Sequence, residues 1–174
     1  MLGAYEFNLE VGFCGDGAFL MAYFGYTPSG VIKMAEFPIF FYPLDIREHH
    51  LDSFGHVNNV AYLQFFEQAR WEVITSAGFG LERILAEGVG PVVLDLNVRF
   101  RRELKCRQAV TVKSQVKEAR GRIWVLRQWI EDAFGEIYSE AAFTLGLMDL
   151  KQRKLVSLSP GWAEAVGAIA LATD

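Results

Sequence analysis

The segment LDSFGHVNNVAYLQFFEQARWEVITSAG, residues 51–78, contains the most informative pattern in this chain. A glycine, Gly78, stands where the C-terminus of a helix is commonly capped. Between residues 59 and 77, apolar side chains recur at helical spacing: Tyr62, Phe66, Ala69, Val73 and Ala77. Further apolar residues lie on other faces of the same predicted helix. A helix that is apolar over so wide an arc is predicted to be enclosed by a sheet or by a partner chain.

A polar loop from Asp52 to Asn59 directly precedes this helix. A helix N-terminus presents unpaired backbone N–H groups and about half a positive charge, so it can polarise a carbonyl group or hold an oxyanion. Asp52 and His56 beside such a terminus are residue types that activate water. The alternative is a purely structural loop, in which Asn58 or Asn59 caps the helix and Gly55 makes the turn.

Strand patterns lie on both sides of the helix. Residues 37–47 are aromatic and β-prone, and Pro43 is predicted to form a bulge there. Residues 81–87 predict a short amphipathic helix. In residues 92–100, the even-numbered side chains are predicted to point inward. Three more strands are predicted to continue a meander, at 109–116, 123–130 and 138–148, and the last can extend to residue 158. This order predicts an α+β chain with one antiparallel sheet and one long central helix.

The first 33 residues differ in character from the rest of the chain. Tyr5 to Phe13 alternates between apolar and polar residues, and a second apolar run follows a turn at residues 15–17. This pattern predicts an extra β-hairpin at residues 1–33. A translation start at Met34 is the alternative. The main domain is predicted at residues 34–159, followed by a C-terminal tail at 160–174.

Length and composition limit the class of protein. The 174 residues, 52% of them hydrophobic and 22% charged, fit one folded domain. The net charge of -4 gives no general reason to expect a nucleic-acid partner. Cys14 and Cys106 are too few for a disulfide framework and fit a reducing compartment. No apolar run is long enough to span a membrane. We therefore expect a soluble, cytoplasmic protein without a nucleic-acid or membrane partner.

The run from Asp52 to Arg70, D-x-x-GHVNN-x-x-YL-x-x-FE-x-AR, resembles the signature of hotdog-fold acyl-CoA thioesterases of the 4-hydroxybenzoyl-CoA thioesterase superfamily. The resemblance covers residues 37–158. It implies a hotdog fold, in which a curved antiparallel sheet of about five strands wraps the long helix. The implied activity is hydrolysis of an acyl thioester to a carboxylic acid and coenzyme A. The resemblance further implies a homodimer, or a homotetramer of two dimers, with no cofactor and no metal.

The resemblance also assigns roles to single residues. Asp52 matches the catalytic aspartate, acting either as general base for water or as the nucleophile that forms a mixed anhydride. Asn59 stands where the backbone N–H polarises the thioester carbonyl, and His56 and Asn58 are expected to orient water or substrate. Glu67 is a reserve candidate for the base; its structural alternative is an i,i+3 ion pair with Arg70. The predicted substrate-binding residues are Gly55, Val57, Tyr62, Phe66 and Glu67.

Two further clusters have both a functional and a structural interpretation. Basic residues near the end of the first strand after the helices fit either the phosphates of coenzyme A or a solvated strand edge: Arg99, Arg101, Arg102, Lys105 and Arg107. His49 and His50, together with His56 and Asp52, match no standard zinc spacing, so no metal site is predicted.

Two rival functions use the same fold. A non-catalytic acyl-CoA or acyl-lipid binding module would keep the cavity but would not need a water-activating carboxylate such as Asp52. A hotdog dehydratase acting on 3-hydroxyacyl thioesters would need a histidine-led motif at the start of a helix, and the sequence lacks a matching one.

Overall fold

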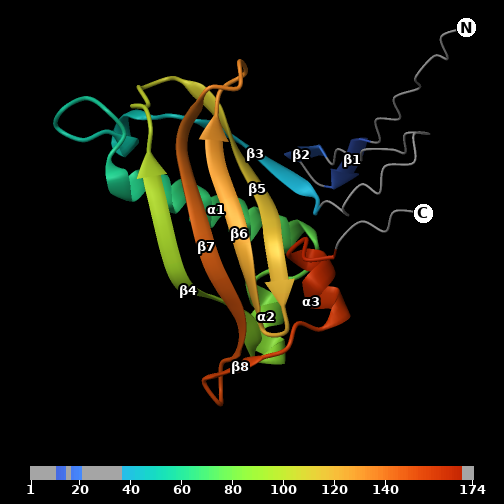
Figure 1. The fold of residues 1–174 in the computed structure, drawn as a ribbon. Helices are drawn as coiled ribbons and strands as arrows, with labels where there is room; N and C mark the ends of the chain where they lie inside the picture. The colour runs from blue at the N-terminus through green and yellow to red at the C-terminus, as the bar shows by residue number, and fades with distance from the viewer. Residues whose placement is uncertain (1–10, 15–16, 21–36, 170–174) are drawn as a thin grey trace, which may run out of the picture.

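The computed structural model describes residues 11–14, 17–20 and 37–169 (Figure 1). In chain order, its elements are β1 (Val11–Cys14), β2 (Gly17–Leu20), β3 (Ile39–Asp45), η1 (Glu48–His50), α1 (Asn59–Ser76), α2 (Leu81–Glu87), β4 (Val89–Phe100), β5 (Ala109–Arg120), β6 (Ile123–Glu131), β7 (Ile137–Asp149), β8 (Lys154–Val156) and α3 (Pro160–Ala165).

One antiparallel sheet of six strands forms the body of the molecule, in the order β3-β5-β6-β7-β4, with β8 paired to β7. The predicted meander is correct for β5, β6 and β7 but wrong for β4. The connection through α1 and α2 carries the chain across the sheet, so β4 pairs with β7 at the far edge rather than with β5. Of the predicted N-terminal hairpin, the structure describes β1 and β2, which pair with each other; the remainder lies outside the described residues.

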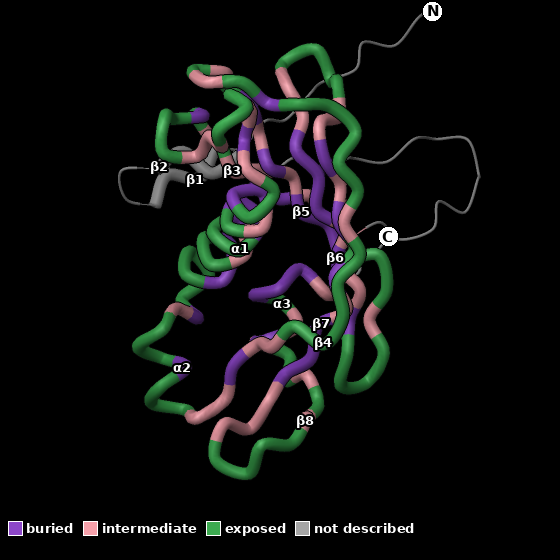
Figure 2. Tube along the Cα trace, turned by 90° about the vertical axis from the view of Figure 1, so that its left-hand side faces the viewer, coloured by how far each residue is buried: buried purple, intermediate pink, exposed green. Residues whose placement is uncertain are grey.

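Helix α1 lies against one face of the sheet, and the core forms between them (Figure 2). Its buried residues include the predicted Tyr62, Phe66, Ala69 and Val73. The sheet contributes inward-facing side chains from alternate positions: Val110, Val112, Val116, Trp124, Leu126, Ile130, Phe143, Leu145 and Leu147. At the C-terminal end of the domain, α3 packs Trp162 against Phe79, with ring centroids 4.6 Å apart. In the part of the chain that is described, no helix is long and apolar enough to cross a membrane.

Two details of the edge strands differ from the predictions. The register of β3 with β5 is continuous through Pro43, so the predicted bulge is absent there. The bulge instead lies in β4, between Val93 and Asp95. It turns Leu94 to the outer face, where its side chain lies beside Gly146. Because β4 is an edge strand, its apolar side chains stay uncovered: Val93 is 49% exposed and Phe100 is 50% exposed.

Candidate active site

The loop before α1 begins with a tight turn built around Asp52. The N–H of Gly55 donates to the carbonyl oxygen of Asp52 at 3.2 Å, and the N–H of Phe54 donates to Asp52 Oδ1 at 2.8 Å. Gly55 has a φ of 84°, a conformation that favours glycine. No described residue forms a hydrogen bond with Asp52 Oδ2. The turn therefore fixes the carboxylate through one oxygen and leaves the other for a ligand or for water.

The N-terminus of α1 is capped, but not completely. The side-chain oxygen of Asn58 accepts from the N–H of Val60 at 2.8 Å, and its carbonyl oxygen accepts from the N–H of Ala61 at 2.9 Å. Asn58 is thus the N-cap residue. Within the described residues, nothing accepts a hydrogen bond from the N–H of Asn59. This donor is one of the unpaired groups at a helix start that can bind a carbonyl oxygen or an anion.

A hollow of about 330 Å³ opens at this end of α1. Four of the predicted site residues line it, namely His56, Val57, Asn59 and Tyr62. The other lining residues come from the end of β4 and the segment after it: Phe100, Arg101, Arg102 and Glu103. The remaining predicted site residues do not line this hollow: Asp52, Gly55, Asn58, Phe66 and Glu67. The hollow therefore joins the helix start to the exposed edge of the sheet.

Glu103 is a site residue that sequence reasoning missed. Its Oε2 lies 3.1 Å from His56 Nε2, and its Oε1 lies 3.1 Å from Lys105 Nζ. Glu103 is far from His56 in the sequence and comes after β4, a strand whose neighbour in the sheet was predicted wrongly. Only the crossing of β4 to the far edge shows that the two side chains meet.

Tyr62 and Val57 fix the segment after β4 against the loop. The N–H of Leu104 donates to the Tyr62 hydroxyl at 3.2 Å, and that hydroxyl donates to the carbonyl oxygen of Arg102 at 3.4 Å. The N–H of Val57 donates to the carbonyl oxygen of Leu104 at 3.0 Å. Burial raises the pKa of Tyr62, so its phenol stays protonated at neutral pH. Both residues line the hollow and also hold its two walls together.

Two predicted substrate-binding residues, Phe66 and Glu67, lie away from this hollow. Phe66 is fully buried, and its ring centroid lies 6.0 Å from that of Phe143. Glu67 lines a second cavity further along α1. The ion pair of Glu67 with Arg70 does not form. Arg70 turns inward instead, and its Nη1 donates to Gln128 Oε1 at 2.8 Å because the helix presents this face to β6.

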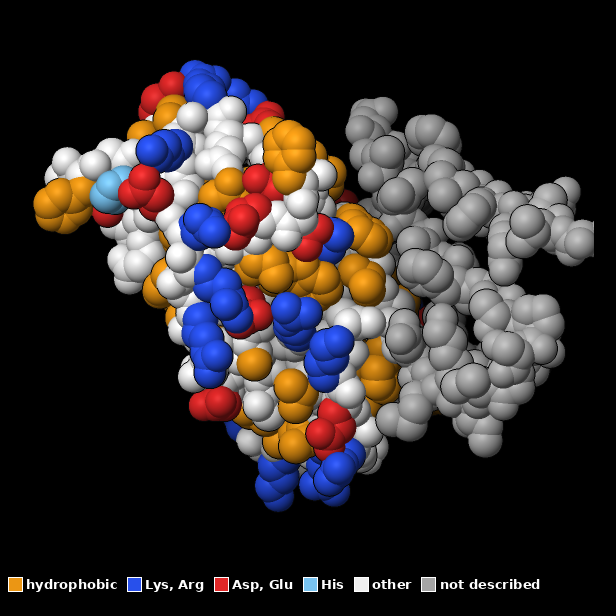
Figure 3. Space-filling view, turned by 45° about the horizontal axis from the view of Figure 1, so that its top comes forward, with side chains coloured by type: hydrophobic (Ala, Val, Ile, Leu, Met, Phe, Trp, Pro, Cys, Tyr) orange, Lys and Arg blue, Asp and Glu red, His pale blue; other side chains and the backbone are white. Residues whose placement is uncertain are grey.

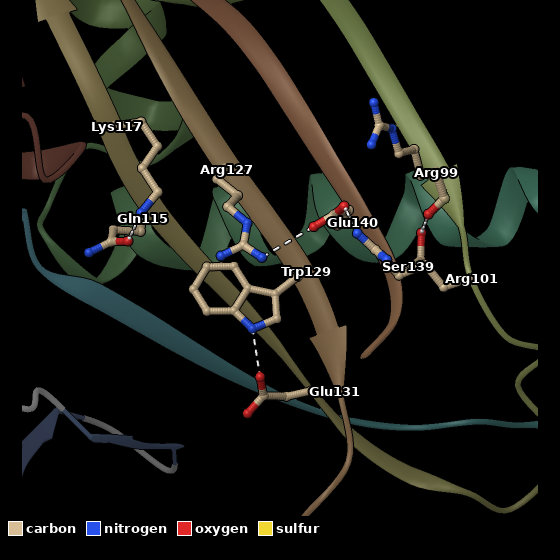
Figure 4. Close-up of polar contacts among 9 residues, drawn as sticks. All are labelled: Arg99, Arg101, Gln115, Lys117, Arg127, Trp129, Glu131, Ser139 and Glu140. Atoms are coloured by element: carbon tan, nitrogen blue, oxygen red, sulfur yellow. Dashed lines mark hydrogen bonds and ion pairs between the residues drawn. The ribbon is translucent and has the colours of Figure 1, made fainter. Parts of the chain in front are cut away.

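Carboxylates neutralise much of the predicted basic cluster. On the outer face of the sheet, Glu140 pairs with both Arg101 and Arg127 (Figure 4). The hydrogen bond from Arg101, with that from Arg127, lowers the pKa of Glu140. Figure 3 shows Lys and Arg side chains spread over this face with acidic groups between them. Arg101 and Arg102 are the members of the cluster that also line the hollow.

The histidines near the loop have structural contacts. The ring of His50 packs edge-on against Phe65, with centroids 4.7 Å apart, and its Nδ1 accepts from the N–H of Arg47 at 3.0 Å. The N–H of Asn58 donates to the carbonyl oxygen of His50 at 2.9 Å, which ties η1 to the helix cap. In residues 37–169, no group of three His, Cys, Asp or Glu side chains is placed to hold a metal ion.

A long helix packed on an antiparallel sheet, with its N-terminus opening into a hollow, places the chain in the hotdog class of folds. A sequence model of the Thioesterase-like superfamily matches residues 46–166, and the chain belongs to this family. The predictions of a hotdog fold and of a thioester hydrolase are thereby confirmed.

Individual relatives agree with this assignment. The chain is 31% identical to the long-chain acyl-CoA thioesterase FadM of Escherichia coli over 116 residues, which cover 66% of this chain and 87% of FadM. Among solved structures, the probable thioesterase YbaW of Escherichia coli matches with a TM-score of 0.65 and 28% identity, covering 75% of this chain and 98% of YbaW. The DHNA-CoA thioesterase of Staphylococcus aureus matches with a TM-score of 0.66 and 25% identity, covering 73% of this chain and 87% of the thioesterase.

Proposed function

We propose that this protein hydrolyses acyl-CoA thioesters to a free carboxylic acid and coenzyme A. The observation that carries the proposal is the unpaired N–H of Asn59, a residue that lines an open hollow at the N-terminus of an 18-residue helix. FadM, the relative matched over most of its length, is named for the same activity. A donor fixed in this way stabilises the negative charge that develops on a thioester oxygen during attack.

In the proposed reaction, the thioester carbonyl accepts a hydrogen bond from the N–H of Asn59, and the positive end of the helix dipole strengthens it. Asp52 takes a proton from water through Oδ2, and the hydroxide attacks the carbonyl carbon. The tetrahedral intermediate then collapses, the carbon–sulfur bond breaks, and the thiolate of coenzyme A leaves and takes up a proton. Direct attack by Asp52 would give a mixed anhydride, which water then hydrolyses. His56, paired with Glu103, orients water or substrate.

We propose that Arg101 and Arg102 contact the phosphates of coenzyme A, because they are the cluster members that line the hollow. Guanidinium groups suit phosphate geometry, and their attraction for it weakens as salt screens the charges. The Michaelis constant for acyl-CoA should therefore rise with ionic strength. A Michaelis constant independent of salt would argue against this contact.

We also propose that two copies of the chain pair through β4, as a homodimer or within a tetramer. Supporting this, β4 is an edge strand that carries uncovered apolar side chains, which include Val93, Leu94, Leu96 and Phe100. Edge strands of this kind offer unpaired backbone groups to another strand. Sedimentation velocity should give the mass of two or four chains. A monomer would contradict the proposal.

Proline substitution offers a direct test of the Asn59 donor. Asn59 is the first residue of α1, where proline is well tolerated, and Asn58 has the extended backbone that proline requires before it (φ -60°, ψ 140°). Asn59→Pro removes the N–H but keeps the helix, so kcat should fall on the order of 10²–10³-fold, as for loss of an oxyanion donor. Thiol release from a panel of acyl-CoA thioesters measures this effect.

The matched control is Asn59→Ala, which loses the side chain but keeps the N–H and should retain most of the activity. Equal rates for the two variants would remove the backbone donor from the mechanism. Wild-type protein that binds acyl-CoA without releasing thiol would instead be a binding module.

A further inference from the structure

A second cavity, of about 130 Å³, lies between the C-terminal half of α1 and the sheet. A dry cavity of about 150 Å³ holds a benzene ring, so this one has room for a few carbon atoms rather than a whole ligand. Its walls are largely apolar and include Ile74, Trp124, Leu126 and Leu145. Three of its lining residues bring a charged group or a hydroxyl: Glu67, Arg70 and Ser114.

Arg70 is the unusual member of this lining. Its guanidinium lies 4.2 Å from the ring centroid of Phe143 and is largely buried, and burial lowers the pKa of Arg70 to about 10. It is thus still charged at neutral pH. No carboxylate of residues 37–169 forms an ion pair with it, and Gln128 accepts its one hydrogen bond to a described residue. Since guanidinium carries five N–H donors, several remain for another acceptor.

Gln128 holds the guanidinium in place. It is fully buried, and its Nε2 donates to the carbonyl oxygen of Phe66 at 3.1 Å and to Ser114 Oγ at 2.8 Å. Its Oε1 is the acceptor of the Arg70 hydrogen bond. The polar groups of α1, β5 and β6 therefore form one fixed network at the cavity wall. A fixed and largely buried donor of this kind discriminates between ligands that do and do not accept its hydrogen bond.

An acyl chain that ran along α1 from the proposed thioester position would reach this cavity. Arg70 is eleven residues after Asn59, just over three helical turns, so both residues share one face of α1. The separation along the helix is roughly 16 Å between Cα atoms, and helical side chains lean back toward the N-terminus by up to one turn, which gives roughly 11–16 Å. An extended peptide spans roughly 3.5 Å per three backbone atoms, or roughly 1.2 Å per atom, and at that rise the distance corresponds to about nine to thirteen carbons.

We propose that Arg70 and Ser114 form a polar subsite for a neutral oxygen, a hydroxyl or keto group, on the acyl chain about nine to thirteen carbons from the thioester. This inference rests on the proposed acyl-CoA function and deepens it. Glu67 lines the same cavity and offsets the positive charge of Arg70, so the two together carry no net charge that would recruit a carboxylate in place of a neutral group. The guanidinium donates to the oxygen, and Ser114 Oγ is a second polar neighbour for it.

Coenzyme A thioethers test the subsite without hydrolysis. The probes are S-dodecyl-CoA, S-(12-hydroxydodecyl)-CoA and S-(6-hydroxydodecyl)-CoA, with dissociation constants measured by titration calorimetry. We expect the 12-hydroxy probe to bind roughly tenfold more tightly than S-dodecyl-CoA, because hydrogen bonds to charged groups are the strong class. The 6-hydroxy probe should bind more weakly than S-dodecyl-CoA, because its hydroxyl meets apolar wall. Equal affinities for all three probes would overturn the subsite.

Variants assign the preference to Arg70. Arg70→Met should abolish the advantage of the 12-hydroxy probe, and retention of that advantage would contradict the proposal. The matched control is Arg83→Met, because Arg83 also lies over an aromatic ring, that of Phe79, but outside the cavity. If Arg70→Met does not fold, the affinities of wild-type protein for the 12-hydroxy and 6-hydroxy probes still test the position of the subsite. Hydrolysis of dodecanoyl-CoA together with equal probe affinities would refute the subsite alone, whereas absence of hydrolysis would refute the proposed function.

Discussion

Two turns of this protein share both sequence pattern and geometry, yet only one lies at the candidate active site. The first is Asp52-Ser53-Phe54-Gly55, and the second is Asp132-Ala133-Phe134-Gly135, between β6 and β7. In each, the aspartate Oδ1 accepts from the phenylalanine N–H, at 2.8 Å and 2.9 Å, and the glycine φ is 84° and 81°. Local sequence alone therefore determines the turn.

The two carboxylates differ in their surroundings. Asp132 has both oxygens engaged, since Oδ1 also accepts from the N–H of Glu136 at 3.0 Å and Oδ2 from the Tyr138 hydroxyl at 3.1 Å. Asp52 Oδ2 has no such partner among the described residues, and the loop continues into the start of α1. A carboxylate thus becomes a candidate base because of the neighbouring elements of the fold, and not because of its own turn.

The largest expected effect separates the two aspartates by activity. Asp52→Asn should lower kcat for acyl-CoA on the order of 10²–10⁴-fold, because it removes the proposed base while its amide oxygen can still accept from Phe54. Asp132→Asn, the matched control, should leave kcat near that of the wild type. Thiol release measures both rates, and circular dichroism checks that both variants fold. Undiminished turnover in a folded Asp52→Asn variant would show that the two turns are functionally equivalent.

The next largest expected effect is a loss of folding stability, which should be equal at the two turns. Gly55→Ala and Gly135→Ala each force a side chain into a left-handed conformation, at a cost of about 1–2 kcal/mol. In both places an added Cβ would meet nothing within 4 Å, so backbone strain is the whole effect. Urea unfolding at fixed protein concentration measures the two changes. Clearly unequal costs would mean that the shared sequence does not give equivalent turns.

The smallest expected effect is a pH dependence of stability at the second turn. The hydrogen bonds from Glu136, Phe134 and Tyr138 outweigh burial and lower the pKa of Asp132 in the folded protein. A carboxyl group with a lowered folded pKa stabilises the protein above its unfolded pKa, about 3.9, and this stabilisation is lost as the pH falls through the folded value.

Asp132→Asn should therefore flatten the decline in unfolding free energy below about pH 4. Urea unfolding across that range measures the slope for the variant and for wild type. The same acid slope in both would show that the three hydrogen bonds do not act on the carboxylate.

The long helix and the loop before it could be predicted from sequence because their signals are local. The spacing of Tyr62, Phe66, Ala69 and Val73 reports a helix whatever lies around it, and α1 begins at the predicted Asn59. Asn58 and Asn59 stood as alternative caps, and the structure assigns the cap to Asn58. That assignment leaves the N–H of Asn59 unpaired, which is the feature on which the proposed chemistry depends.

The pairing of β4 could not be predicted because alternation records which residues share a face, not which strand is the neighbour. The apolar pattern of residues 92–100 indicated burial, but at an edge the same side chains are uncovered, and one bulge turns Leu94 outward. The contact of Arg70 with Gln128 could not be predicted either, because Glu67, three residues earlier on the helix, offered a local ion-pair partner.

The amino-acid order was enough to establish the α+β class, the extent of α1, the turn at Asp52 and the family signature. All of these depend on spacings of a few residues along one element. The three-dimensional packing was needed to show that β4 lies at the free edge, that Glu103 meets His56, and that Arg70 lies over Phe143 beside a cavity. These features join residues that are distant in the chain, and their contacts exist only once the sheet has closed over the helix.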